Sequence, residues 1–154
     1  MRKFFIVSFL LFCCLFAYSE EKKTAIGLGI EVNMDSRHLF ALGAVLGINY
    51  NITEMFAMGL SVEASTNFDH IRTIEPMANI RLYFYENNIG NFFGQVDMGA
   101  FFFYEDGYDV YPMPLFGVRA GFRRTLGPLF YLEPSFRAGY PFALGLELMA
   151  GIRL

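Results

Sequence analysis

The sequence predicts an all-β chain that folds as an eight-stranded antiparallel up-and-down transmembrane β-barrel and is preceded by a cleaved signal peptide. Three observations lead to this prediction. Apolar residues alternate with polar or small ones over most of positions 25–154, glycines and charges gather on the face opposite the apolar one, and the N-terminus has the features of a secretory leader. A period of two residues is typical of a β-strand whose two faces meet different environments.

Eight segments carry this alternation. Their even-numbered residues are apolar in almost every case, and their odd-numbered residues are small, polar or charged. In chain order the segments are 26–32, 42–50, 56–64, 74–84, 96–102, 116–122, 130–138 and 144–154. The last segment is the clearest, because leucine, alanine or isoleucine occupies every even position from Leu144 to Leu154.

Polar breaks that carry glycine, proline or asparagine separate the segments. They lie at 33–38, 51–54, 67–70, 86–91, 105–109, 125–128 and 139–141. None is long enough for a crossover helix, so successive strands should pair antiparallel as a meander. Pro76 and Pro134 fall within segments and each removes a ladder hydrogen bond, so a bulge or irregular pairing is expected there.

Residues 1–19 are interpreted as the signal peptide. Two basic residues precede the apolar stretch 4–16, and the small-x-small pattern Ala17-Tyr18-Ser19 follows it. The stretch is shorter than the ~20 residues that a transmembrane helix needs. Cleavage after Ser19 leaves residues 20–154 as one barrel domain.

Both cysteines, Cys13 and Cys14, lie in this leader, so the mature chain has no thiol for a disulfide or a metal site. A lipoprotein with Cys14 lipidated is the alternative, although Phe12 and Cys13 stand where a small residue is usual. We expect no cofactor and no metal. Without residues 1–19 the formal charge changes from −3 to −5, which is unfavourable for binding nucleic acid.

Glycines indicate which face of the strands lies inside. Those on the odd-numbered face are Gly27, Gly29, Gly43, Gly47, Gly59, Gly99, Gly117, Gly121, Gly139, Gly145 and Gly151, whereas Gly94 is on the other face. An eight-stranded barrel is just wide enough for side chains to fill it, so glycines inside make room for long neighbours. On the exterior of a soluble, lipocalin-like barrel they would only weaken the strands. The pattern therefore favours a membrane barrel with its apolar face towards lipid.

Charged residues on the odd-numbered face nearly balance and predict an ion-pair network in the lumen. Its expected members are Glu31, Glu63, Glu75, Asp97, Glu133, Glu147, Arg81, Arg119, Arg123, Arg137 and Arg153. Pairing is needed because an unpaired buried charge costs several kcal/mol. All the cations in this set are arginines, whose planar group suits buried carboxylates, and no lysine follows Lys23.

Aromatic residues predict two interfacial rings of the kind that flank the apolar band of membrane barrels. One ring would contain Tyr50, Phe56, Phe84, Phe92, Phe122 and Phe130, and the other Phe40, Phe68, Phe102, Tyr104, Phe116, Phe136, Tyr140 and Phe142.

The closing segment resembles the C-terminal signal that outer-membrane proteins present to the barrel-assembly machinery. Glu147 matches its polar position, and Ile152 and Leu154 match its final hydrophobic positions, with leucine in place of the usual phenylalanine and Met149 where glycine is common. Over residues 24–154 the chain resembles in architecture the small eight-stranded outer-membrane proteins of the OmpA transmembrane-domain, OmpX and OmpW types. The resemblance implies the outer membrane of a diderm bacterium, with lipid and the assembly machinery as partners, and we expect a monomer.

These observations predict a non-enzymatic membrane protein with a filled, ion-paired lumen and a structural or interaction role. The alternative is a narrow pore or transporter of small or apolar molecules, which the OmpW resemblance implies. A barrel enzyme that modifies lipid A is less favoured. The two histidines, His38 and His70, form no His-x-Ser motif, and a general base needs a nucleophile within hydrogen-bond distance.

Overall fold

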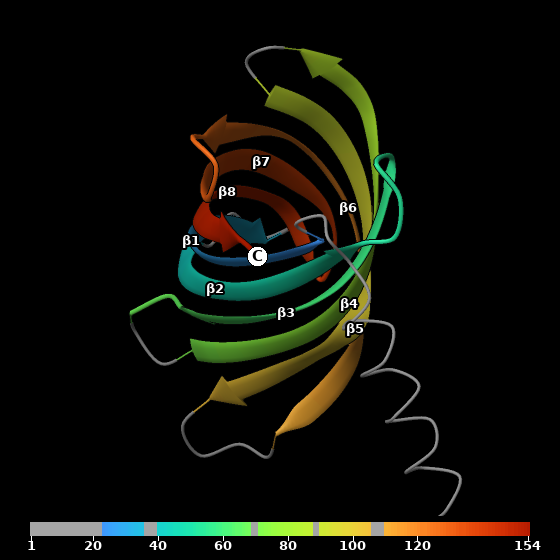
Figure 1. Cartoon of the computed structure of the whole chain (residues 1–154). Helices are drawn as coiled ribbons and strands as arrows, with labels where there is room; N and C mark the ends of the chain where they lie inside the picture. The colour runs from blue at the N-terminus through green and yellow to red at the C-terminus, as the bar shows by residue number, and fades with distance from the viewer. Residues whose placement is uncertain (1–22, 36–39, 69–70, 88–89, 106–109) are drawn as a thin grey trace, which may run out of the picture.

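The computed structural model describes residues 23–35, 40–68, 71–87, 90–105 and 110–154, and its eight strands close into one barrel (Figure 1). The strands are β1 (Thr24–Asp35), β2 (Phe40–Asn51), β3 (Phe56–Thr66), β4 (Ile71–Asn87), β5 (Gly90–Glu105), β6 (Tyr111–Leu126), β7 (Phe130–Tyr140) and β8 (Phe142–Arg153). Each strand pairs antiparallel with the next, and β8 pairs with β1. The predicted eight-stranded antiparallel barrel is confirmed, whereas the predicted signal peptide lies outside the described residues.

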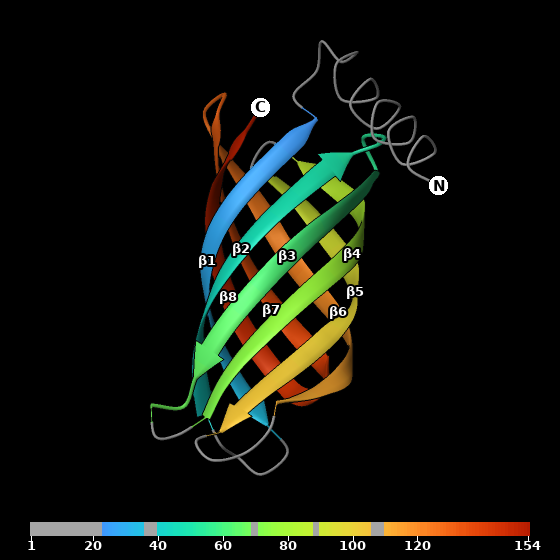
Figure 2. The same ribbon diagram turned by 90° about the horizontal axis from the view of Figure 1, so that it is seen from below.

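Seen from the side, the strands cross the barrel at a tilt, and β1 begins at the same end at which β8 stops (Figure 2). We call this the terminal end. The neighbouring ends of β2 and β3, of β4 and β5, and of β6 and β7 also lie there, because the strands alternate in direction. In the described part of the chain no helix is long and apolar enough to cross a bilayer.

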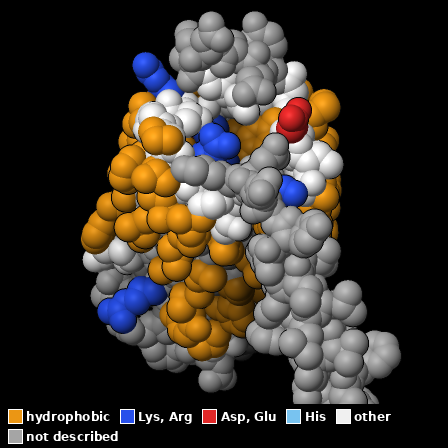
Figure 3. Space-filling view, viewed as in Figure 1, with side chains coloured by type: hydrophobic (Ala, Val, Ile, Leu, Met, Phe, Trp, Pro, Cys, Tyr) orange, Lys and Arg blue, Asp and Glu red, His pale blue; other side chains and the backbone are white. Residues whose placement is uncertain are grey.

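The two faces of the strands differ as the sequence predicts. Leu28, Leu60 and Leu146 on the even-numbered face are 62–64 % exposed, whereas Glu31 and Glu63 on the odd-numbered face are fully buried. Hydrophobic side chains accordingly make up much of the described wall that is in view in Figure 3. The prediction that the apolar face lies outside the barrel is confirmed.

Glycines on the inner face provide room for lumen side chains. A Cβ at Gly121 would overlap the Phe93 ring and lie 2.8 Å from Ser135 Cβ, and one at Gly145 would overlap the Glu31 carboxylate. The exception predicted at Gly94 also holds, since a Cβ there would meet only the exposed Phe84 ring, at 3.2 Å.

Several strands run further than the sequence predicts. The expected breaks 33–38 and 86–91 are wrong in extent, because Asn33 pairs with Ala41 and Gly145, and Asn87 pairs with Gly90. Apolar alternation reports only the part of a strand with an apolar outer face, while polar residues continue the same hydrogen-bonded ladder beyond it.

Both prolines interrupt the ladder as expected, without a bulge. The pairing of β4 with β5 passes from Ile74–Phe102 to Met77–Gly99 and omits Pro76. The pairing of β6 with β7 is likewise interrupted opposite Pro134. Register shifts occur instead between Tyr83 and Tyr85 of β4 and where β8 meets the end of β1.

The second of these shifts corrects the prediction for Phe142. This residue is only 9 % exposed and packs inside with Met77, Phe101 and Leu115, rather than in an outer aromatic ring. Met34 pairs with Leu144 but Asp35 pairs with Phe142, so β8 carries one extra residue at this point. An extra residue reverses the alternation of faces, which turns Phe142 inward.

Candidate functional site: the charged lumen

Ten of the eleven predicted lumen charges lie inside the barrel with exposed fractions between 0 and 6 %. They come from every strand except β2. The eleventh, Arg153, is only half-buried and lines an opening at the terminal end, and no ion pair joins it to the others within the described residues. Alternation places each side chain inside, because odd-numbered residues of a strand share one face.

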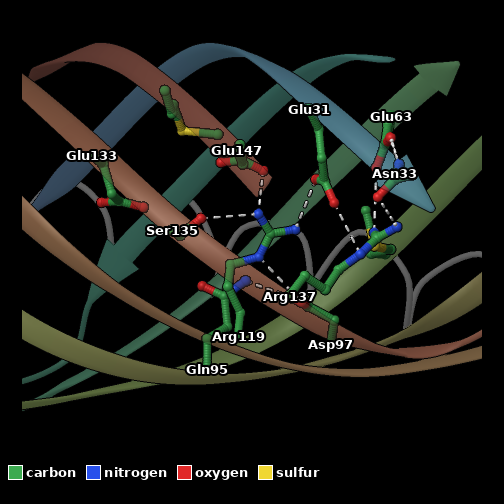
Figure 4. A network of polar contacts seen from close by, with 12 residues as sticks. Glu31, Asn33, Glu63, Gln95, Asp97, Arg119, Glu133, Ser135, Arg137 and Glu147 are labelled. Carbon is green, nitrogen blue, oxygen red and sulfur yellow. Dashed lines mark hydrogen bonds and ion pairs between the residues drawn. The ribbon is translucent and has the colours of Figure 1, made fainter. Parts of the chain in front are cut away.

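Arg119 of β6 is the first centre of the network (Figure 4). Its Nη1 pairs with Glu147, its Nη2 lies 3.3 Å from Glu31 Oε2, and its Nε lies 3.4 Å from Asp97 Oδ2. Its Nη1 also donates to Ser135 Oγ at 3.3 Å. One guanidinium therefore joins β1, β5, β6, β7 and β8 across the lumen.

Arg137 of β7 is the second centre. Its Nε lies 3.0 Å from Glu31 Oε1, and its Nη1 and Nη2 each lie 3.2 Å from a carboxylate oxygen, of Glu63 and Glu75 respectively. Asn33 completes this group by accepting from Arg137 Nη2 at 3.3 Å and donating to Glu63 Oε1 at 2.5 Å. Glu31 contacts both arginines and so joins the two centres into one assembly.

Glu133 lies in a second assembly, closer to the terminal end. Its Oε2 accepts from Arg81 Nη1 at 2.8 Å and from Arg123 Nε at 2.6 Å. Aromatic rings cover both cations: the Arg81 guanidinium carbon is 3.9 Å from the Phe93 centroid, and that of Arg123 is 4.3 Å from the Tyr131 centroid.

Gln95 links the two assemblies. It accepts from Arg81 Nε at 2.7 Å and donates to Asp97 Oδ1 at 2.5 Å. A continuous polar network therefore runs along the inside of the barrel, and its members come from strands that are far apart in sequence.

Charge is divided unevenly between the two assemblies. The assembly of Arg119 and Arg137 has two guanidinium groups against five carboxylates, namely Glu31, Glu63, Glu75, Asp97 and Glu147. The other has two guanidinium groups against the single carboxylate Glu133. Carboxylates are thus in excess in the middle of the lumen, and arginines are in excess near the terminal end.

Apolar groups pack against both sides of the network. Met77, Phe101, Leu115 and Phe142 form a buried cluster on the side away from the terminal end, with Phe103 and Met113 packed against it. Tyr131 and Met149 form a second cluster with Ala25 and Val45, and Tyr83 packs with Phe93 and Ala57. Side chains therefore fill the lumen along much of its length.

Sequence reasoning missed the neutral members of the site, such as Asn33, Gln95, Ser135 and Tyr131. All four occupy odd-numbered, inward positions, so their alternation was the available signal. No set of three His, Cys, Asp or Glu among the residues that the structure describes could hold a metal ion. His38 and His70 lie outside the described residues. The arrangement can bind strands together and exclude water from the lumen.

No protein-family model matches the sequence, and neither does any curated protein sequence. Solved structures are similar in fold. The N-terminal β-barrel domain of OprF from Pseudomonas aeruginosa is 13 % identical with a TM-score of 0.66, and covers 84 % of this chain and 97 % of its own. Neisserial surface protein A is 13 % identical with a TM-score of 0.67, covering 85 % and 94 %.

The attachment invasion locus protein Ail of Yersinia pestis is 16 % identical with a TM-score of 0.57, covering 86 % of this chain and 97 % of its own. At these identities the similarity extends to the fold alone. The chain thus has the closed eight-stranded architecture that these small barrel proteins share.

Proposed function

We propose that this chain is an integral protein of the outer membrane of a diderm bacterium, with a sealed barrel that has a structural or interaction role and no catalytic activity. Outer-membrane lipid surrounds it, the barrel-assembly machinery inserts it as a monomer, and Glu147, Ile152 and Leu154 form its assembly signal. The main support for the proposal is a pattern of burial opposite to that of a soluble protein. Large apolar side chains cover the outside, while charges are enclosed.

The exterior supports contact with lipid. Outward residues such as Leu46, Val118 and Leu148 are 46–59 % exposed, and similar apolar residues occur on all eight strands. In water, so large an apolar surface would drive association. Strands of 11–17 residues also reach or exceed the ~9–11 residues that a tilted strand needs to cross a bilayer. Exposed Phe40, Phe68 and Phe84 lie near strand ends, as an aromatic belt requires.

The interior supports a sealed barrel rather than a pore. Each arginine centre bridges carboxylates from opposite sides of the lumen, and aromatic and aliphatic clusters pack on both sides of the network. An ion would have to separate these pairs to pass, and separating a buried pair leaves charges uncompensated. In a membrane the same pairs hold the strands together where apolar packing inside the barrel is limited.

Fractionation followed by electrophoresis in SDS tests the membrane assignment. The native chain should occur in the outer-membrane fraction, and an unheated sample should migrate apart from a boiled one, because a closed barrel stays folded in SDS. A folded, monomeric chain in buffer without detergent would contradict the proposal.

Conductance across planar bilayers separates the sealed barrel from the narrow-pore alternative. We expect no steady current over a range of voltages once the heat-modifiable band has been recovered from the same vesicles. Reproducible single-channel steps that disappear with boiled protein would instead assign the chain to the transporters.

A further inference from the structure

An opening of about 660 Å³ lies at the terminal end of the barrel, beyond the lumen network. The side chains and backbone of Lys23, Asn51, Asn91, Arg123, Thr125 and Arg153 line it, together with Glu54. Figure 3 looks onto this end, where most of the charged groups in view are Lys or Arg. Among these residues, only Arg123 belongs to the lumen network, where its Nε pairs with Glu133.

The opening is cationic in a chain that is acidic overall. Three cations, Lys23, Arg123 and Arg153, line it against the single carboxylate of Glu54, whereas the whole chain has a formal charge of −3. The last residue of the chain, Leu154, does not line the opening. Its backbone oxygen instead accepts a hydrogen bond from Thr24 N of β1 at 3.2 Å. The layer below leaves this balance unchanged, because Arg81 is offset by Glu133, the carboxylate that Arg81 and Arg123 share.

Arg123 is a lining residue with an unsatisfied donor. It is only 5 % exposed, its Nε donates to Glu133 at 2.6 Å, and its plane lies over Tyr131, yet its Nη2 has no hydrogen-bond partner. Burying a guanidinium nitrogen without an acceptor costs more free energy than an ordinary hydrogen bond contributes. Because Arg123 is among the residues that line the opening, an anion bound there would lie close to this guanidinium group.

We infer that the opening at the terminal end is a binding site for a phosphate group, either free or carried by a phospholipid headgroup. Lys23, Arg153 and the partly neutralised Arg123 supply positive charge around it, and the amide of Asn91 and the hydroxyl of Thr125 supply neutral donors. Charge-assisted hydrogen bonds from arginine are the strong contacts by which proteins hold phosphate. The inference does not depend on where the barrel resides in the cell.

The test is a calorimetric titration of the full chain folded in an uncharged maltoside detergent. One arm uses inorganic phosphate and the other uses short-chain phosphatidylglycerol, so that the two arms separate a free anion from a lipid headgroup. The variants are Lys23→Gln and Arg153→Gln, which avoid the ion pairs of the lumen. The matched control is Arg124→Gln, which removes an exposed cation of β6 near the same end that does not line the opening.

We expect saturable binding in at least one arm, weakened about tenfold or more by each rim variant and unchanged by Arg124→Gln, since each rim variant removes a charged hydrogen bond. The heat-modifiable band verifies that every variant is folded. Absence of saturable binding in both arms overturns the inference. So does equal weakening by Arg124→Gln, because it would reveal general attraction to the charge of the barrel rather than a site.

Discussion

Substituting Glu133 by glutamine should destabilise the barrel far more than the same substitution at Glu75, although both carboxylates are fully buried. Glu133 is the single carboxylate between Arg81 and Arg123, with donor–acceptor distances of 2.8 and 2.6 Å. Glu133→Gln keeps the shape but leaves two buried guanidinium groups with neutral partners. Breaking a buried pair in this way costs about 3–5 kcal/mol.

Glu75 is in the opposite situation. Its partner Arg137 keeps Glu31 at 3.0 Å and Glu63 at 3.2 Å after the substitution, and the surrounding assembly has more carboxylates than guanidinium groups. Glu75→Gln therefore removes one charged contact while relieving repulsion, and we expect a cost of about 1 kcal/mol or less.

Urea unfolding from lipid vesicles, followed by the loss of the heat-modifiable band, measures the difference. With a slope of about 1–3 kcal/mol per molar urea, Glu133→Gln should lower the unfolding midpoint by about 1 M or more, and Glu75→Gln by a small fraction of that. Equal losses for the two variants would refute the reasoning, because they would mean that the local balance of charge does not determine the stability of the lumen.

Three further predictions follow from the two faces of the strands. Leu148→Arg places a charge on the outer face and should reduce the stability of the folded barrel by about 2–4 kcal/mol in the same urea assay, whereas Leu148→Phe should be tolerated; equal behaviour would contradict contact with lipid. Gly121→Ala should lower the yield of folded barrel because its Cβ overlaps the Phe93 ring, while Gly117→Ala, whose nearest neighbour is 3.6 Å away, should fold normally; matching yields would show that the lumen has spare room. Arg119→Ala leaves three carboxylates without this partner and should lower the temperature at which the folded band disappears in SDS, and an unchanged temperature would show that these pairs do not stabilise the barrel.

The strands and their faces could be predicted because alternation is a local property. Leu146 is exposed and Glu147 is buried because successive side chains of a strand point to opposite faces. This alternation can be read from the local sequence alone. Alternation also identified the charges that the structure encloses, together with the inward glycines.

The pairing of those charges could not be predicted. Glu31 meets Arg119 and Arg137 through the register of a closed barrel, which depends on how all eight strands align. The face predicted for Phe142 was wrong for a related reason. The extra residue in β8 can be recognised only from the pairing of β8 with β1. The opening at the terminal end combines residues from both ends of the chain, and Arg153 belongs to it rather than to the ion-paired network.

The central claim is that lipid touches the apolar face while the charged face is enclosed, and tryptophan fluorescence tests it most directly. The chain has no tryptophan, so a single substitution gives an unambiguous reporter. Phe92 and Phe93 are adjacent in β5 and are 44 % and 0 % exposed, so Phe92→Trp and Phe93→Trp place the same group at nearly the same depth on opposite faces. In vesicles of lipids with brominated acyl chains, and once the heat-modifiable band shows that each variant is folded, the Phe92→Trp fluorescence should be strongly quenched and the Phe93→Trp fluorescence largely protected. Equal quenching of the two, or stronger quenching of Phe93→Trp, would contradict the claim.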